Sequence, residues 1–182
     1  MNRINYILIT IALLFSVSLI GQEPHEEETH EFKHFRVAAA IGHAYIPEAK
    51  TDTDTFLLIP TFGLDLQYWF NPKWGIALKN DIEIADYIVE GNDGENNEIA
   101  REYPIIVAIP VLFSPWENRG FNFILGPGIE FEDHEDFFVI RVGFGSEFEI
   151  GNHWDFSPEL IYDLKNGHIN SLTLAFGIGK RF

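Results

Sequence analysis

The chain has 182 residues, with 12 basic and 28 acidic side chains, a formal charge of −16 and no cysteine. A chain of this length predicts a single domain. The absence of cysteine excludes disulfides and a lipid-modified N-terminal cysteine. The acidic balance argues against nucleic acid as a partner and against electrostatic docking on an anionic lipid surface.

Residues 1–21 have the pattern of a cleaved secretory signal peptide. A basic start, Met1 to Arg3, precedes an apolar run from Ile4 to Ile20. Cleavage is expected after Gly21 or, as the second choice, after Ser18. A retained membrane anchor is the alternative, but no basic stop-transfer cluster follows the apolar run. Without Arg3 the remaining 11 basic and 28 acidic residues give −17.

Residues 22–34 form a polar lead-in that is rich in glutamate and histidine. Within it, His30, Glu31 and His34 match the H-E-x-x-H pattern of zinc proteases. That site needs a helix and a third ligand further along the chain, whereas a strand is predicted to begin directly after His34. A solvated tail with no metal site is the preferred interpretation.

Residues 35–182 are predicted to form eight strands, because apolar and polar residues alternate and no helical periodicity follows the signal peptide. The predicted strands are about Phe35–Ile46, Thr55–Phe70, Trp74–Val89, Tyr103–Phe113, Gly120–Glu132, Phe137–Ile150, Trp154–Leu164 and Ile169–Phe182.

The connections between these strands alternate in character. Short turns rich in Asn, Pro and Gly are predicted at Asn71–Lys73, Ser114–Arg119 and Gly151–His153. The other connections are polar and in two cases longer: Pro47–Asp54, Glu90–Arg101, Asp133–Asp136 and Lys165–His168. This pattern predicts an antiparallel up-and-down barrel. Bacterial outer-membrane barrels place short turns at the periplasm, where both ends of this chain would then lie.

The two faces of the strands differ in bulk. One face is crowded with Phe, Leu, Trp and Tyr, while the other carries Gly, Ala, Ser and charged residues. A soluble lipocalin-like barrel would place the bulky face inside, but an eight-stranded barrel is too narrow for it. The bulky face is therefore predicted to face lipid, with an aromatic girdle at one interface. The girdle residues are Tyr68, Phe70, Trp74, Trp116, Trp154 and Phe182.

The first, third and fourth strands fit this alternation less well. Asn80 and Asp86 fall on the outward phase of the third strand, and Ile106 and Leu112 fall on the inward phase of the fourth. Prolines also stand within predicted strands, where each removes a ladder donor. They are Pro60, Pro104, Pro110, Pro127 and Pro158. Bulges or strand ends are expected at some of them.

Residues 35–182 resemble the small outer-membrane β-barrel family, which includes the transmembrane domain of outer membrane protein A and the eight-stranded proteins X and W. The ending Gly177 to Phe182 and the start at Gln22 look like members from the Bacteroidota. The resemblance implies an outer-membrane location, contact with outer-membrane lipid, and Phe182 as the signal read by the barrel assembly machinery. Lys180 departs from that signal, which more often has an apolar residue there.

The inward phase of the predicted strands carries acids and bases that are expected to fill the lumen as a charge network, since isolated buried ions are costly. The predicted members are Arg36, Asp65, Lys79, Asp81, Glu83, Glu130, Arg141, Glu147, Glu149, Asp155, Glu159, Asp163 and Arg181. Because acids outnumber bases, a narrow cation-preferring pore is the alternative.

We therefore expect a non-enzymatic barrel with an anchoring or loop-binding role and no cofactor. A lipid hydrolase or acyltransferase is a further alternative, with His43, His168 and Ser171 as candidate residues. The acidic loops at 51–54 and 91–98 suggest calcium binding, but the second loop lacks the spacing of a calcium hand.

Overall fold

The computed structural model describes residues 32–47, 49–50, 57–90, 98–116, 120–133, 135–166 and 169–182. The predicted signal peptide and most of the lead-in, including His30 and Glu31, lie outside these residues. No helix in the described part of the chain is long and apolar enough to cross a membrane.

A barrel is formed by eight strands, two of which are interrupted. They are β1 (Phe35–Ile46), β3 (Leu57–Trp69), β4 (Trp74–Glu83), β7 (Ile105–Ala108) with β8 (Val111–Phe113), β9 (Asn122–Phe131), β10 (Phe137–Gly145) with β11 (Phe148–Gly151), β12 (Trp154–Lys165) and β13 (Ile169–Arg181).

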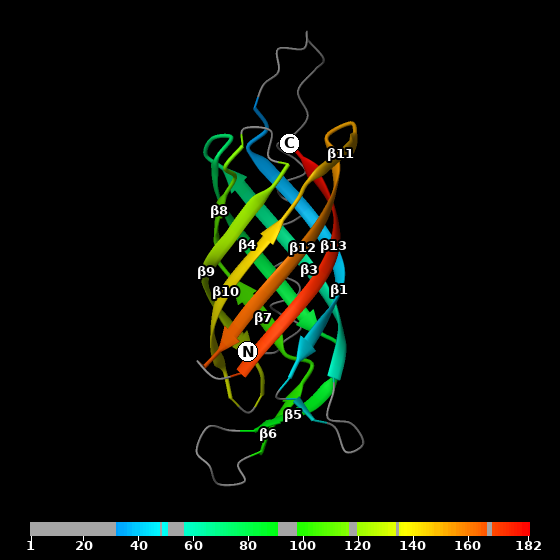
Figure 1. Ribbon diagram of the computed structural model, residues 1–182, viewed down its shortest axis with the longest axis vertical. Helices are drawn as coiled ribbons and strands as arrows, with labels where there is room; N and C mark the ends of the chain where they lie inside the picture. The colour runs from blue at the N-terminus through cyan, green and yellow to red at the C-terminus, as the bar shows by residue number, and fades with distance from the viewer. Residues whose placement is uncertain are drawn as a thin grey trace. The chain divides into compact units, whose positions relative to one another are not determined.

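The strands pair antiparallel around a closed ring, as Figure 1 shows. The first and last strands close it, in register from Arg36 opposite Arg181 to Tyr45 opposite Leu172. The predicted eight-stranded antiparallel barrel is therefore confirmed. We call the end where Phe70 to Lys73 join β3 to β4 the turn end, and the opposite end the loop end.

A second, three-stranded sheet lies at the loop end, formed by β2 (Ala49–Lys50), β5 (Asp86–Glu90) and β6 (Glu98–Glu102) (Figure 1). The predicted strand Trp74–Val89 therefore corresponds to two separate strands, β4 and β5, and β6 lies largely where a loop was predicted. The chain leaves the barrel after Glu83, and β5 pairs with β2 and β6 instead of with barrel strands. Asp86 therefore lies in the second sheet and not on the barrel wall.

The fourth strand of the barrel is interrupted at Pro110, between β7 and β8. Its carbonyl still accepts a hydrogen bond from the Ala77 amide at 2.9 Å. Opposite it stands Gly126, where a Cβ atom would come within 2.4 Å of the Pro110 Cα. The predicted inward positions of Ile106 and Leu112 are confirmed, since both are buried.

The outer face of the barrel carries the bulky apolar side chains. At the turn end the exposed aromatic residues include Phe70, Trp74, Trp116 and Trp154. Towards the loop end a second set includes Tyr103, Phe131, Phe138 and Tyr162. Between the two sets the exposed residues are mainly Ile, Leu, Val and Phe, so an apolar band surrounds the barrel.

Trp69 is an exception to this division by bulk. Its side chain points into the barrel at the turn end and is completely buried. Space for the indole ring comes from Gly75 on the neighbouring strand, where a Cβ atom would lie 3.0 Å from the Trp69 Cδ2. One large aromatic residue therefore fits in the narrow interior, at a position where the adjacent wall carries no side chain.

Candidate functional site: the charged bore

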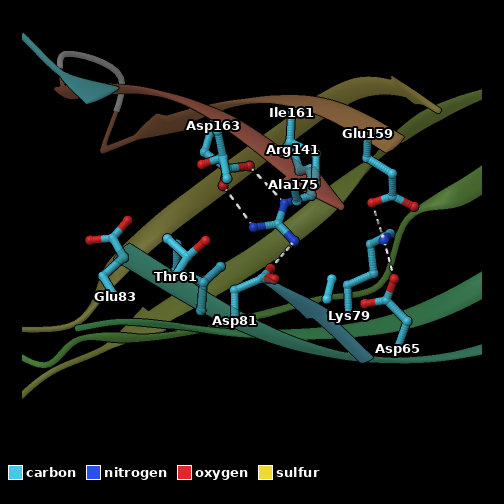
Figure 2. A pocket seen from close by; sticks show the side chains of 13 residues that line it. Thr61, Asp65, Lys79, Asp81, Glu83, Arg141, Glu159, Ile161, Asp163 and Ala175 are labelled. Atoms are coloured by element: carbon cyan, nitrogen blue, oxygen red, sulfur yellow. Dashed lines mark hydrogen bonds and ion pairs between the residues drawn. The ribbon is translucent and has the colours of Figure 1, made fainter. Parts of the chain in front are cut away.

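The middle of the bore is spanned by Arg141 on β10. Its guanidinium group donates two hydrogen bonds to Asp163 on the adjacent strand β12, at 2.8 and 2.7 Å. The same group reaches Asp81 on β4, across the bore, at 2.5 Å. Figure 2 shows Arg141 extending between these two carboxylates. A paired guanidinium in this position ties two non-adjacent parts of the wall together.

A second cross-bore group surrounds Lys79 on β4. Its ammonium group bonds Asp65 on the adjacent strand β3, and Glu159 on β12 at 2.8 Å (Figure 2). Lys79 is 1% exposed and Asp65 is 5% exposed. A lysine this deeply buried requires paired carboxylates, because an isolated buried charge is very costly.

Towards the loop end, Lys165 holds two carboxylates together. Its ammonium group lies 2.8 Å from Glu83 and 2.6 Å from Glu130. Arg101 on β6 also bonds Glu130, and the hydroxyl group of Tyr87 donates to Glu83 at 2.5 Å. Side chains of the second sheet therefore complete the charge network of the barrel.

Towards the turn end, Arg36 bonds Asp155 and Ser157 on β12. The distance from its Nε to Asp155 is 2.9 Å, and Nη2 lies 2.8 Å from the Ser157 hydroxyl. The guanidinium group lies over Gly179 of β13, where a Cβ atom would come within 2.5 Å of it. Arg181 bonds Glu147, which lies 3.9 Å from Arg36.

Glu149 departs from the predicted network. Its side chain is exposed on β11, whereas the sequence alternation placed it in the bore. The strand is interrupted at Ser146 and Glu147, and β11 pairs with β12 with a register shift between Glu149 and Gly151. Glu149 still lies opposite the buried Asp155, in the same register as Gly145 opposite Glu159, so it keeps the inward phase. It is exposed because all of β11 stands exposed at the turn-end rim of the barrel. The other predicted network residues lie in the bore and form the ion pairs described above.

Both ends of the bore are closed by apolar side chains. At the turn end Trp69, Ala77, Leu112 and Ile124 pack together, and Phe32 of the lead-in packs against them. At the loop end the closing cluster comprises Ile46, Ala49, Ile59, Tyr87, Val89, Phe137 and Ile169.

A cavity lies between these clusters, beside Arg141 and Lys79. Its volume is about 10 Å³. That is roughly the space that one ordered water needs. The cavity is therefore far smaller than a continuous path for hydrated ions would require.

Several residues of the network were not predicted. They are Lys165, Arg101, Tyr87 and Glu132, whose carboxylate lies 4.0 Å from Arg101. Lys165 was placed in a loop, although it continues the inward series that runs from Asp155 to Asp163. Extending that alternation by one step would have found it. Arg101 and Tyr87 belong to the second sheet, and no local pattern indicated that their side chains turn back towards the barrel.

The candidate hydrolase residues do not converge in the described part of the chain. Ser171 is 1% exposed and points into the bore, whereas His43 is exposed on the outer face. The barrel wall therefore separates their side chains. His168 and the acidic loop segments 51–54 and 91–97 lie outside the described residues.

Comparison with solved structures identifies similar folds. The outer membrane protein OprG of Pseudomonas aeruginosa is 15% identical, with a TM-score of 0.57 over 85% of this chain and 99% of that one. Neisserial surface protein A is 13% identical, with a TM-score of 0.54 over 81% of this chain and 97% of that one. The fold is that of a small outer-membrane β-barrel. No protein-family model and no curated protein matches the sequence.

Proposed function

We propose that this chain is a non-enzymatic outer-membrane barrel that anchors the second sheet at the cell surface and does not conduct ions. The observation that carries the proposal is the filled bore. Three cross-wall groups, centred on Arg141, Lys79 and Lys165, occupy it between two apolar clusters. The apolar band with aromatic residues at both edges supports the membrane location.

The proposed surface role depends on which parts of the protein can contact a binding partner. The cavity beside Arg141 and Lys79 has space for about one water molecule, and the band around the wall is apolar. The β5–β6 hairpin extends from the loop end and is stabilised by the Arg101 and Tyr87 contacts with the barrel. We infer that this hairpin and its loop carry any binding function. Both chain ends would lie at the periplasm, and Phe182 would serve as the assembly signal.

Planar-bilayer recording of the refolded barrel tests the closed bore against the cation-pore alternative. We expect no stable single-channel steps for the wild type, because no continuous hydrated path crosses the two apolar clusters. Trp69→Ala with Phe137→Ala removes one large aromatic side chain from each cluster but leaves the three charged groups. This variant should also stay closed if the charged groups fill the bore, provided that it keeps its heat-dependent migration in detergent gels. Steady cation-selective steps from the wild type would overturn the proposal.

A further inference from the structure

The exposed charges of the barrel are divided between its two ends. Among the side chains that the structure describes, every lysine or arginine that is not buried lies at the turn end: Lys33, Lys73, Lys180 and Arg181. The carboxylates of the two ends that are not buried are concentrated at the loop end: Asp86, Glu102, Asp133, Glu135 and Asp136, with Glu147 and Glu149 at the turn end. Among the described residues the turn end therefore carries more bases than acids, in a chain that is strongly acidic.

Lys180 differs from the other turn-end cations because it belongs to the outer wall. On β13 the outward series is exposed at Leu174, Phe176 and Ile178, and Lys180 continues it. The following residue, Arg181, turns inward to Glu147 instead. An ammonium group thus stands at the edge of the apolar band.

Trp154 lies directly beside this lysine on the neighbouring strand. The two residues are cross-strand partners, and the Lys180 ammonium group lies 5.4 Å from the centre of the Trp154 ring. Trp154 is 42% exposed and belongs to the turn-end aromatic set. At a membrane interface, lysine extends its ammonium group towards the lipid headgroups. Tryptophan is enriched at the same level, where its N–H group can contact the headgroups.

We propose that Lys180 and Trp154 form a binding site for the phosphate group of an anionic glycerophospholipid in the leaflet at the turn end. The ammonium group supplies the charge, and the indole N–H supplies a second donor. This inference rests on the proposed membrane location. The cost of an outward lysine falls towards zero near the interface, so the barrel accommodates Lys180 there.

The charge division favours the same lipid. An anionic headgroup at the loop end would meet exposed carboxylates, whereas at the turn end the described side chains that are not buried include four bases, Lys180 among them, and two acids, Glu147 and Glu149. The net charge of the whole chain argues against anionic lipid, but screening limits each headgroup to charges within about 10 Å. The local cations therefore decide the preference at this rim.

The test is native mass spectrometry of the refolded barrel released from nanodiscs with equal amounts of phosphatidylglycerol and phosphatidylcholine. We expect wild-type barrels to retain phosphatidylglycerol in excess. Lys180→Leu should reduce that excess roughly fivefold, the effect of one lysine near an anionic surface. Trp154→Phe keeps the ring without its N–H group and should reduce the excess by a smaller factor.

The matched control is Lys33→Gln, which removes one charge at the same end but not from the outer wall. It should retain the wild-type excess, and inorganic phosphate in the buffer should not compete. Equal retention by folded Lys180→Leu, an equal loss in Lys33→Gln, or displacement by inorganic phosphate would each overturn the site. A chain that inserts into neither lipid would overturn the membrane location itself, and the site with it.

Discussion

At the scale of single residues, the middle of the bore depends on matched charges, whereas apolar packing is confined to its two ends. Arg141 is 2% exposed, and the two carboxylates that it bonds lie on different walls of the barrel. Removing one partner from such a group leaves the others buried without compensation, which is more costly than removing the whole group. Lys79 and Lys165 also each bind two carboxylates, so removing either lysine would leave both of its buried partners with less compensation.

The first prediction concerns Arg141. Arg141→Met should lower the free energy of unfolding by about 3 to 5 kcal/mol, because Asp81 and Asp163 would remain charged and unpaired. The triple variant Arg141→Met, Asp81→Asn, Asp163→Asn removes all three charges and should recover most of that loss. Urea titration of the refolded barrel in detergent or liposomes measures both values. If the triple variant were less stable than the single one, the pairing would not be the cause.

A second prediction concerns the contact between Gly179 and Arg36. Gly179→Val places a side chain where the Arg36 guanidinium now lies, since even a Cβ atom would come within 2.5 Å of it. We expect a loss of stability of about 1 to 3 kcal/mol from overpacking. Gly151→Ala is a control at a position with open space around it but with a φ of +109°, so it reports backbone strain without the clash.

At the scale of elements, the sequence predicted the strands of the barrel wall better than the structure beyond it. The limits of β1 agree with the predicted Phe35–Ile46, where the polar lead-in precedes the strand and Pro47 follows it. The split of β4 from β5 was missed, because Asp86 alone interrupts the apolar outward series between Ile82 and Val89 while the chain leaves the wall. That departure depends on pairing with β2 and β6, a non-local contact that a strand pattern does not encode.

The residues of the charge network were also predicted better on the regular strands of the wall than elsewhere. Inward charges on regular strands, such as Asp65, Glu159 and Asp163, were predicted because period-two alternation fixes their face. Glu149 keeps the predicted phase, opposite Asp155, but is exposed because β11 stands at the rim of the barrel. Arg101 was missed because it reaches the bore from the second sheet. Sequence alternation therefore gives the face of a wall residue, but it does not show where the bore ends or which side chains enter it from outside the wall.

A third prediction concerns the second sheet as an element. Because Arg101 and Tyr87 bond carboxylates of the bore, the hairpin and the barrel should unfold together. Arg101→Met should therefore lower the unfolding free energy of the whole barrel by about 2 kcal/mol or more, by leaving Glu130 with less compensation. Glu102→Gln, on the exposed face of the same strand, should have almost no effect. Separate unfolding steps for hairpin and barrel would contradict this coupling.

At the scale of the whole molecule, the division of exposed charge gives the barrel a polarity along its axis. The proposed orientation places the acidic loop end outside the cell and the turn end at the periplasm. Because the chain contains no cysteine, single introduced cysteines report this orientation without background. The exposed residues Tyr103 at the loop end and Lys73 at the turn end are suitable positions.

The fourth prediction is the labelling pattern of these variants. On intact cells a membrane-impermeant maleimide should react with Tyr103→Cys and not with Lys73→Cys. Both should react after the outer membrane is opened. Labelling of Lys73→Cys alone on intact cells would show that the barrel has the opposite orientation. The proposed Lys180 site would then lie in the outer leaflet.

The inward position of Trp69 has a consequence for observing this protein. The other tryptophans, Trp74, Trp116 and Trp154, are exposed at the rim, whereas the indole ring of Trp69 is enclosed beside Leu112 and Ile124. Quenchers attached to acyl chains should therefore reduce the fluorescence of the three rim tryptophans and leave that of Trp69 almost unchanged. In a variant with Trp69 as the only tryptophan, fluorescence would report closure of the barrel during refolding.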